Sequence, residues 1–152
     1  MTTAENKILS LLGKSNFPYE LHEHEPVYTC EQASKVRGIP ISEGIKCLLL
    51  KSENDFVLAL TRGDKRVDMK KIAQLENVKK LQLANEKEVE KIAECSIGCV
   101  HPFCDVKIYC DKILLENESI EFNPGCHDKT IRMKVSNLLE LLKNGSKDIT
   151  YF

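Results

Sequence analysis

The two apolar runs Gly44-Ile-Lys-Cys-Leu-Leu-Leu50 and Phe56-Val-Leu-Ala-Leu-Thr61 decide the fold of this chain. Each run has the length of a strand and is bounded by polar residues, which favours two buried strands. The polar segment Lys51-Ser-Glu-Asn-Asp55 lies between them and suits a hairpin connection. We therefore predict that the two runs pair with each other and form the centre of the sheet.

Lys46 has an unusual position, because it follows the polar stretch Ile41-Ser-Glu-Gly-Ile45 and opens the first apolar run. An ammonium group at the mouth of a buried strand is costly to desolvate, since burial disfavours its charged form. Such a lysine is expected to contact an anionic or hydrogen-bonding partner. Lys46 is therefore the first candidate functional residue.

Helices and further strands are predicted on both sides of this hairpin. Thr29-Cys-Glu-Gln32 has the pattern of a capping box, and Asp68 and Asn85 are typical N-cap residues. Gly13 and Gly38 are placed to end the helices that precede them. We expect helices at 4–13, 29–36, 69–75, 85–93 and 136–142, and further strands at 19–24, 106–110, 113–115, 119–122 and 129–133.

The order of these elements predicts an α+β fold. It is neither a regular βαβα alternation nor an all-β pattern, so a mixed sheet with helices packed on it is the simplest architecture. The 152 residues fit one domain, which we expect to span residues 1–152.

The composition is that of a globular protein, with 42% hydrophobic and 30% charged residues. The 22 basic and 23 acidic side chains nearly cancel, so the chain lacks the strong positive field of sequence-independent nucleic-acid binders. Any contact with RNA must therefore be local. No apolar segment approaches the ~18 residues that span a bilayer, and the N-terminus lacks the apolar core of a signal peptide. We expect a cytoplasmic location and no membrane partner.

The seven cysteines are expected to be free thiols, because their number is odd and the chain has no secretion signal. Several of them surround His101 in the sequence, but their spacings match no common structural zinc site. His22 and His24 share one face of a predicted strand, with no third ligand nearby. We favour packing in or near the core for the cysteines, and a zinc or thiol-redox protein is the weakest alternative.

Three separated segments are candidates for one site: Lys46, the loop Gly98-Cys-Val-His-Pro102 and the turn Asn123-Pro-Gly-Cys-His127. Glycine in a loop permits close backbone approach, and proline fixes the chain beyond it. The loop can therefore direct backbone N–H groups into a concavity that suits an oxyanion or a carbonyl oxygen. A loop of this composition is also a common plain connection, so it does not identify a site by itself.

Four ordered motifs extend over nearly the whole chain. They are Glu25-Pro-Val-Tyr-Thr-Cys-Glu-Gln-Ala-Ser34, Gly44-Ile-Lys-Cys-Leu-Leu-Leu-Lys51, Gly98-Cys-Val-His-Pro-Phe103 and Phe122-Asn-Pro-Gly-Cys-His-Asp-Lys-Thr-Ile-Arg132. In this combination, from about Pro18 to Leu142, the chain resembles the YbaK family. That family comprises aminoacyl-tRNA deacylase domains that stand alone or are inserted in bacterial prolyl-tRNA synthetases.

The resemblance implies a mixed, mainly antiparallel and partly barrel-like sheet flanked by helices. It also implies hydrolysis of the ester between a wrongly attached amino acid and the terminal adenosine of tRNA, without a metal or organic cofactor. Lys46 matches the essential lysine of the family, and Gly98 and Pro102 match its Gly-x-x-x-Pro loop. These three are the expected catalytic residues.

A second set of residues is expected to contact the substrate. His127 matches a histidine that shapes the amino-acid pocket in several branches of the family, and Gly125 lies in the same turn. Asp111 falls near an acidic position of some members. His101 stands at a variable position of the loop, where it either lines the pocket or faces solvent. Cys47 takes the place of the Thr or Asn that is common beside the lysine.

The residues agree with ester hydrolysis, which needs a positioned water or hydroxyl, a group that stabilises developing negative charge, and a clamp on the leaving nucleoside. Backbone N–H groups from Gly98 to His101 can supply the second. Lys46 can bind the terminal phosphate or the ribose, or hold the water.

A thiol nucleophile at Cys47, with His101 or His127 as its base, is a weaker alternative. Successive strand residues point to opposite faces of a sheet. Cys47 is therefore expected to face the core if Lys46 faces the cleft.

We predict a free-standing enzyme of translational quality control that removes a small amino acid such as Ala, Ser, Thr or Cys from misacylated tRNA, with tRNA-Pro as a candidate carrier. Its expected partner is the acceptor end of that tRNA, and an aminoacyl-tRNA synthetase is a candidate second partner, whereas DNA is not expected. The alternative from another class is a non-catalytic module that binds aminoacyl-tRNA or a synthetase. Such a module would show no hydrolysis even with Lys46 intact.

Overall fold

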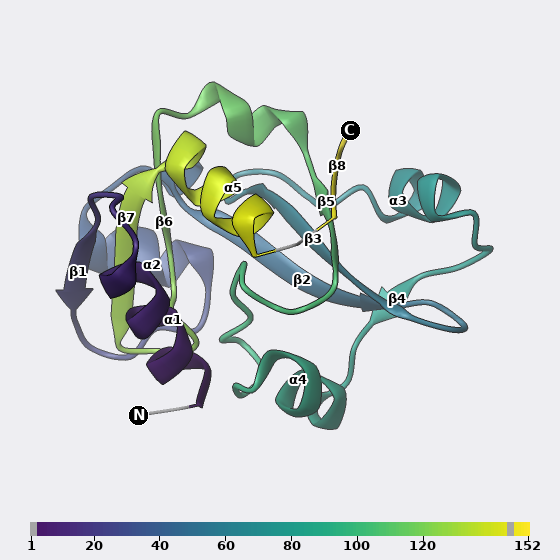
Figure 1. Ribbon diagram of the computed structural model, residues 1–152, viewed down its shortest axis with the longest axis horizontal. Helices are drawn as coiled ribbons and strands as arrows, with labels where there is room; N and C mark the ends of the chain where they lie inside the picture. Colours follow the sequence, from purple (N-terminus) through teal and green to yellow (C-terminus); the bar gives the residue numbers. More distant parts are fainter. Residues whose placement is uncertain (1–2, 146–147) are drawn as a thin grey trace.

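The structure is a computed structural model that describes residues 3–145 and 148–152, and it shows two sheets covered by helices (Figure 1). The helices are α1 (Thr3–Lys14), α2 (Cys30–Arg37), α3 (Met69–Glu76), α4 (Glu86–Ala93) and α5 (Val135–Asn144), with the short 3-10 helices η1 (Ile41–Glu43) and η2 (Lys112–Glu116). The strands are β1 (Glu20–Glu23), β2 (Ile45–Lys51), β3 (Phe56–Arg62), β4 (Gln82–Leu83), β5 (Lys107–Cys110), β6 (Ser119–Phe122), β7 (Lys129–Lys134) and β8 (Ile149–Tyr151). Within the described ranges, no helix is both long enough and apolar enough to cross a membrane.

The two sheets differ in size and in pairing. The smaller sheet is antiparallel with the order β1-β7-β6, and the larger sheet has the order β4-β2-β3-β5-β8. In the larger sheet β4, β2 and β3 are antiparallel, whereas β3, β5 and β8 are parallel. A backbone bridge between Gly44 and Glu121 connects the start of β2 to β6. The predicted α+β fold with mixed, mainly antiparallel pairing is confirmed, although the sheets do not close into a barrel.

The predicted hairpin of β2 and β3 lies at the centre of the larger sheet, with its register running from the Ile45–Arg62 pair to the Lys51–Phe56 pair. Because side chains alternate along a strand, the hairpin contributes to a separate hydrophobic cluster on each face. On one face, Ile45, Leu49, Leu58 and Leu60 belong to the main hydrophobic cluster. On the other face, Leu50, Val57 and Ala59 belong to the second cluster.

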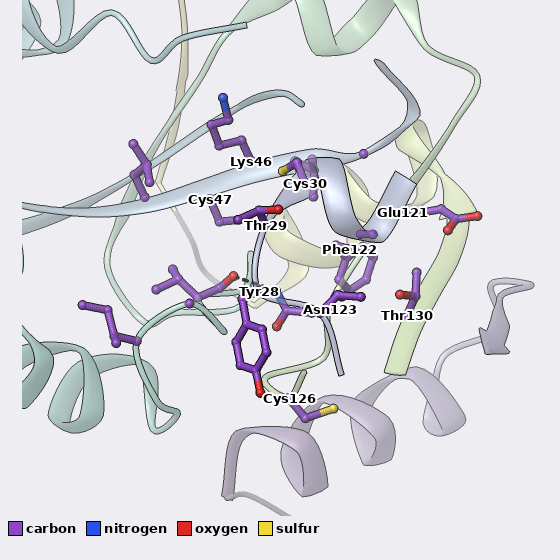
Figure 2. Close-up of a pocket in the computed structure, with 18 of the residues that line it drawn as sticks. Tyr28, Thr29, Cys30, Lys46, Cys47, Glu121, Phe122, Asn123, Cys126 and Thr130 are labelled. Carbon is purple, nitrogen blue, oxygen red and sulfur yellow. Dashed lines mark hydrogen bonds between the residues drawn. The ribbon is translucent and has the colours of Figure 1, made fainter. Parts of the chain in front are cut away.

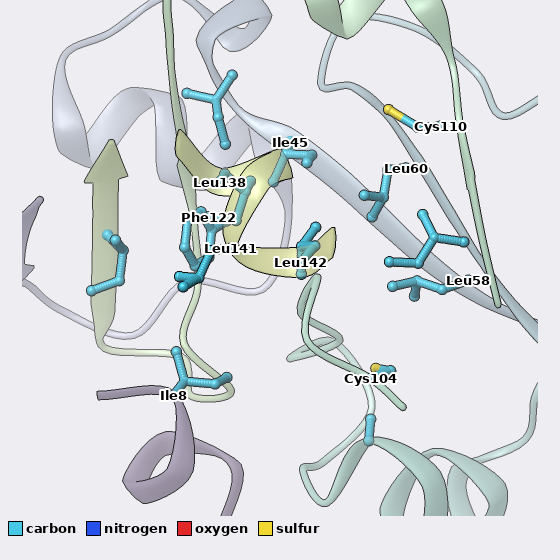
Figure 3. Packing of buried hydrophobic residues seen from close by; sticks show 14 of the residues in the cluster. Ile8, Ile45, Leu58, Leu60, Cys104, Cys110, Phe122, Leu138, Leu141 and Leu142 are labelled. Atoms are coloured by element: carbon cyan, nitrogen blue, oxygen red, sulfur yellow. The ribbon is translucent and has the colours of Figure 1, made fainter. Parts of the chain in front are cut away.

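Helices cover both faces of the hairpin. On the face of the main cluster, α5 contributes Leu138, Leu141 and Leu142. Ile8 of α1 belongs to the same cluster (Figure 3). On the opposite face, α3 packs Ile72 into the second cluster. Each fully buried leucine or isoleucine stabilises the fold by roughly 1.5–3 kcal/mol, so both faces of the hairpin are firmly held.

The predicted helix caps are present. The side chains of the expected N-cap residues each accept a hydrogen bond from a backbone N–H of the first turn: Thr29, Asp68 and Asn85. The side chain of Gln32 accepts from the N–H of Tyr28, one residue before the position that a full capping box uses. Gly38 ends α2 in the left-handed conformation with φ of 66°, as predicted.

Two local predictions are wrong and two strands were missed. Residues 113–115 belong to η2 rather than to a strand, because the Asp111 carboxylate accepts a hydrogen bond from the N–H of Ile113 (3.0 Å) and caps a turn. Gly13 lies inside α1, which continues to Lys14, and is not a left-handed residue beyond it. The strands β4 and β8 are two and three residues long, too short for a periodic signal.

Gly63 holds the open end of the hairpin against the segment that precedes β2. Its N–H donates to the carbonyl oxygen of Gly44 (2.7 Å). A Cβ atom at this position would lie only 2.4 Å from the carbonyl oxygen of Ile41. Only glycine fits such a contact, which fixes the backbone just before Lys46.

We expect Gly63→Ala to lower the free energy of unfolding by ~2 kcal/mol, because a methyl group forced against fixed backbone has the cost of overpacking. Gly13→Ala is the matched control, since nothing lies within 4 Å of a Cβ atom there and the residue is helical. This control is expected to raise the free energy of unfolding by ~0.5 kcal/mol. Urea unfolding followed by circular dichroism measures both, and an unchanged stability of Gly63→Ala would contradict the close contact.

Candidate functional site

A cavity of about 400 Å³, lined by residues from both sheets, is the candidate site (Figure 2). Its walls come from α2 and the segment before it, from β2, from the region of β4 and α4, from the loop at Gly98, and from β6 with the turn that leads to β7. Most of the lining side chains are apolar. The charged ones are Lys46, Glu121 and Lys129.

Lys46 lines this cavity from the start of β2, with Thr61 as its cross-strand neighbour. Its Nζ donates a hydrogen bond to the carbonyl oxygen of Lys65 (2.7 Å), in the loop after β3. Figure 2 shows the Lys46 side chain rising from β2 on the side away from Tyr28 and Cys126. The ammonium group thus has the hydrogen-bonding partner that its position requires, and this partner is uncharged.

Cys47 lines the cavity next to Lys46 but packs against the main hydrophobic cluster. The alternation of β2 therefore separates the two side chains, as expected from the strand. Burial raises the pKa of the Cys47 thiol well above its ordinary value. A thiol that stays protonated at neutral pH is a poor nucleophile, which weighs against the thiol-nucleophile alternative.

Gly98 lines the same cavity as Lys46 and adopts φ of 90°. A Cβ atom at Gly98 would lie 3.4 Å from Cε1 of His127, so the loop and the turn meet at the cavity wall. The N–H of Cys99 donates to the carbonyl oxygen of Ser96 (3.0 Å) and closes a turn. Among the described residues, no acceptor takes the N–H of Gly98 or of Val100.

The far end of this loop turns away from the cavity. His101 is buried and lines a second cavity of about 370 Å³ that is bordered by α1, α4 and α5. Its Nε2 donates to the carbonyl oxygen of Ala93 (2.8 Å) and its Nδ1 accepts from the N–H of Phe103 (3.1 Å), which assigns a neutral ring. Neither His101 nor Pro102 lines the first cavity. Their roles at the substrate stay predictions.

His127 and Gly125 lie in the turn between β6 and β7. The His127 ring contacts Tyr28, with 4.4 Å between the ring centroids, and its Nδ1 donates to the carbonyl oxygen of Val27 (3.1 Å). Gly125 has φ of 90°, and a Cβ atom there would lie 2.8 Å from Cβ of Ala4 in α1. His127 therefore borders the cavity through Tyr28 and the loop at Gly98, whereas Gly125 packs on α1 outside the lining.

Asp111 lies outside the lining of the cavity. Its carboxylate caps η2, as described above, and is within 3.5 Å of the hydroxyl oxygen of Thr61, which donates to it. These contacts give Asp111 a structural role, and its predicted contact with the substrate stays a prediction.

Two buried carboxylates that form ion pairs at the cavity wall were not predicted from the sequence. Glu121 is 4% exposed and accepts hydrogen bonds from Arg37 (2.8 and 3.0 Å) and from Arg132 (3.1 Å). Lys129 donates to the buried carboxylate of Glu5 in α1 (2.7 Å), and this hydrogen bond raises the pKa of the lysine. The sequence held one weak signal, an acidic residue within an apolar strand, and the distant partners gave none.

A comparison with known protein families shows to which family the chain belongs. Residues 24–141 match the family described as the aminoacyl-tRNA editing domain. The chain belongs to this family. The predicted family is thus confirmed, and with it the class of activity, aminoacyl-tRNA editing by ester hydrolysis.

The similarity to known editing proteins extends over nearly the whole chain. The multifunctional Ser/Thr-tRNA deacylase ProXp-y of Escherichia coli (strain K12) is 28% identical over 148 residues, which cover 92% of this chain and 89% of the relative. The prolyl-tRNA editing protein ProX of Acetoanaerobium sticklandii is 25% identical over 153 residues, which cover 94% and 93%. A crystal structure of a candidate trans-editing enzyme for prolyl-tRNA synthetase has a TM-score of 0.83 at 21% identity and covers 99% of this chain and 97% of that chain, which supports the fold.

Three thiols line the cavity of this editing domain: Cys30, Cys47 and Cys126. Burial raises the pKa of Cys126 to about 12 and also raises that of Cys30, where the nearby charge of Lys46 acts in the opposite direction. These thiols are therefore protonated at neutral pH. Within residues 3–145 and 148–152, no three His, Cys, Asp or Glu side chains are grouped so that they could hold a metal ion.

We expect Cys47 of the folded editing domain to react with iodoacetamide at pH 7.5 at least ~10-fold more slowly than in the urea-unfolded chain, because only the thiolate reacts and burial keeps this thiol protonated. A raised pKa means that the thiolate forms only as the pH rises, so labelling of the folded protein should increase from pH 7.5 to 9. Mass spectrometry of the digested protein gives the rate at each cysteine. Equal rates for Cys47 in the folded and unfolded chain would contradict its burial.

Proposed function

We propose that this chain is a free-standing deacylase that hydrolyses the ester of misacylated tRNA and removes a small amino acid. The observation that carries the proposal is that Lys46 and Gly98, distant in sequence, line one cavity within the region that matches the editing-domain family. In this proposal the chain acts as one domain in the cytoplasm. Its partner is the acceptor end of the tRNA.

We propose that Lys46 holds the leaving nucleotide of the substrate by its phosphate or ribose. Its Nζ contacts a loop carbonyl rather than a carboxylate, so its charge is not neutralised by this partner. Exchange of that neutral carbonyl oxygen for a phosphate oxygen would place a negative charge opposite the ammonium group, which adds an ionic attraction to the hydrogen bond. In Figure 2 the side chain extends away from Cys126, which lies on the buried wall of the cavity, and this supports contact with the nucleotide rather than with the amino acid.

The loop at Gly98 supplies the electrostatic part of the proposed reaction. Both Gly98 and Val100 line the cavity, and their N–H groups have no acceptor among the described residues, so we propose that they donate to the substrate. Donors fixed in advance and directed at a carbonyl oxygen stabilise the negative charge that develops there when a water or hydroxyl attacks. The protonated thiols of the cavity agree with a reaction that does not use a protein nucleophile.

Polar side chains of the cavity wall are already hydrogen-bonded within the protein, and the wall is otherwise mainly apolar, which supports overlapping specificity among small amino acids. Asn123 donates to the carbonyl oxygen of Val100 (3.1 Å) and accepts from the N–H of Gly125 (2.8 Å). The hydroxyl of Thr130 is hydrogen-bonded to His24 (2.7 Å). A mainly apolar wall distinguishes one methyl or hydroxyl group by only ~1–3 kcal/mol, so Ala, Ser and Thr should all be accepted to some extent.

We expect Lys46→Ala to lower kcat/KM for the preferred misacylated tRNA by ~100-fold or more, because the fixed charge that acts on the substrate is lost. The side chain is half-buried and bonded to one carbonyl oxygen, so the free energy of unfolding should change by less than ~1 kcal/mol. Lys65→Ala is the matched control, since it retains the carbonyl oxygen that Lys46 contacts and should keep wild-type hydrolysis. The measurement is the release of labelled amino acid from tRNA.

A panel of tRNAs charged with Ala, Ser, Thr, Cys and Pro tests the proposal itself. The expected result is that at least one of the small residues is released much faster than in buffer. If no member of the panel is cleaved, the chain is a binding module and the proposal is overturned. If Lys46→Ala cleaves at the wild-type rate, the role given to the lysine is overturned while the activity stands.

A further inference from the structure

The mouth of the cavity is formed by exposed apolar and aromatic side chains. Tyr28, Leu83 and Ile97 are 60%, 59% and 52% exposed, the three highest values among the large hydrophobic residues that the structure describes. All three line the cavity. Single exposed apolar residues are normal on a protein surface, but three that border one cavity indicate an apolar ligand at its mouth.

The Tyr28 ring is held in place from one side. His127 lies against it with 4.4 Å between the ring centroids and an angle of 45° between the planes. The His127 ring is fixed in turn, because its Nδ1 donates to the carbonyl oxygen of Val27 and the N–H of Val27 donates to the carbonyl oxygen of His127 (2.9 Å). Because His127 covers one side of Tyr28, the exposed surface of the tyrosine lies on the other side. Figure 2 shows this ring extending from the segment before α2 toward Cys126.

We infer, on the basis of the proposed function, that Tyr28 is the stacking surface for the base of the terminal nucleotide of the tRNA. A nucleobase is planar and apolar on its faces, so it fits an exposed aromatic ring that is already held in place. Leu83 and Ile97 cover further parts of the base at the mouth. The acyl group then enters the cavity beyond the ring.

Lys46, a cation that lines the same cavity, supports this arrangement. The charge of Lys46 acts on the thiol of Cys30, which lies two residues after Tyr28 at the start of α2. With the base on Tyr28, the phosphate of the same nucleotide would extend past the start of α2 toward Lys46, whose side chain lies on the side of β2 away from the ring. The combination of an aromatic surface with a cation is typical of sites for single-stranded nucleic acid and fits the unpaired end of a tRNA.

The experiment measures single-turnover hydrolysis of the preferred misacylated tRNA as a function of enzyme concentration for Tyr28→Ala and Tyr28→Phe. Tyr28→Ala should raise the concentration for half-maximal rate by ~10-fold, since stacking on one base is lost, while the maximal rate changes little. Tyr28→Phe keeps the ring and should retain wild-type binding. Tyr151→Ala is the matched control, because Tyr151 is 40% exposed and lies outside the cavity lining.

A second measurement isolates the base. Calorimetry compares 3′-deoxy-3′-(serylamino)adenosine with the same compound lacking adenine. The wild type should bind the adenine compound ~10-fold more tightly, and Tyr28→Ala should lose this difference.

Three results would overturn the inference. One is that Tyr28→Ala reaches its half-maximal rate at the same enzyme concentration as the wild type. Another is that the wild type binds the two compounds with equal affinity. The third is an effect of Tyr28→Ala that appears only when a synthetase is added, which would make the mouth a protein-binding surface. If the wild type hydrolyses no member of the tRNA panel, the proposed function fails first, so the two failures are distinguishable.

Discussion

The backbone junction between the two sheets is the constraint on which the cavity depends. Gly44 takes part in the bridge to Glu121 of β6 and also accepts the N–H of Gly63 at the end of β3. The absence of a side chain at Gly63 lets that end of the hairpin approach the carbonyl oxygen of Ile41. Since β2 and β6 each supply a wall of the cavity, a shift at this junction would change its shape and the place of Lys46.

Buried charge reinforces the same junction. The Glu121 carboxylate is almost without contact to solvent and is held by Arg37 from α2 and Arg132 from β7. Arg132 also contacts Glu43 in η1 (2.6 Å), so the network links α2, η1 and both strands. Removal of one partner from a buried pair typically costs about 3–5 kcal/mol, because the other charge is left unpaired. The network therefore specifies how α2, which has no buried residue of its own, lies against the sheets.

The sequence predicted those features that local patterns control. The hairpin followed from two apolar runs, and the starts of α2, α3 and α4 followed from capping residues whose side chains bond within one turn. The parallel pairing of β5 with β3 and β8 depends on contacts between distant segments, so no local pattern indicated it. The site shows the same division. Lys46 was found because a lysine at the start of an apolar strand is unusual. The contact of Tyr28 with His127 could not be predicted, because it joins two segments that lie about 100 residues apart in the sequence.

The charges around the cavity indicate what kind of catalysis it can support. Lys129 is paired with Glu5, and Glu121 with two arginines, so both charges are already balanced by the protein. In the part of the chain that the structure describes, the Lys46 ammonium group is hydrogen-bonded to a carbonyl oxygen, and the thiols beside it are protonated because burial raises their pKa. The cavity wall therefore has paired charges at Lys129 and Glu121, protonated thiols, and a cation, Lys46, whose partner is neutral. Such a wall offers binding and electrostatic stabilisation rather than a nucleophile. Hydrolysis in such a site must rely on how firmly the nucleotide and the ester are positioned, which is the task of the backbone donors at Gly98 and of the apolar mouth.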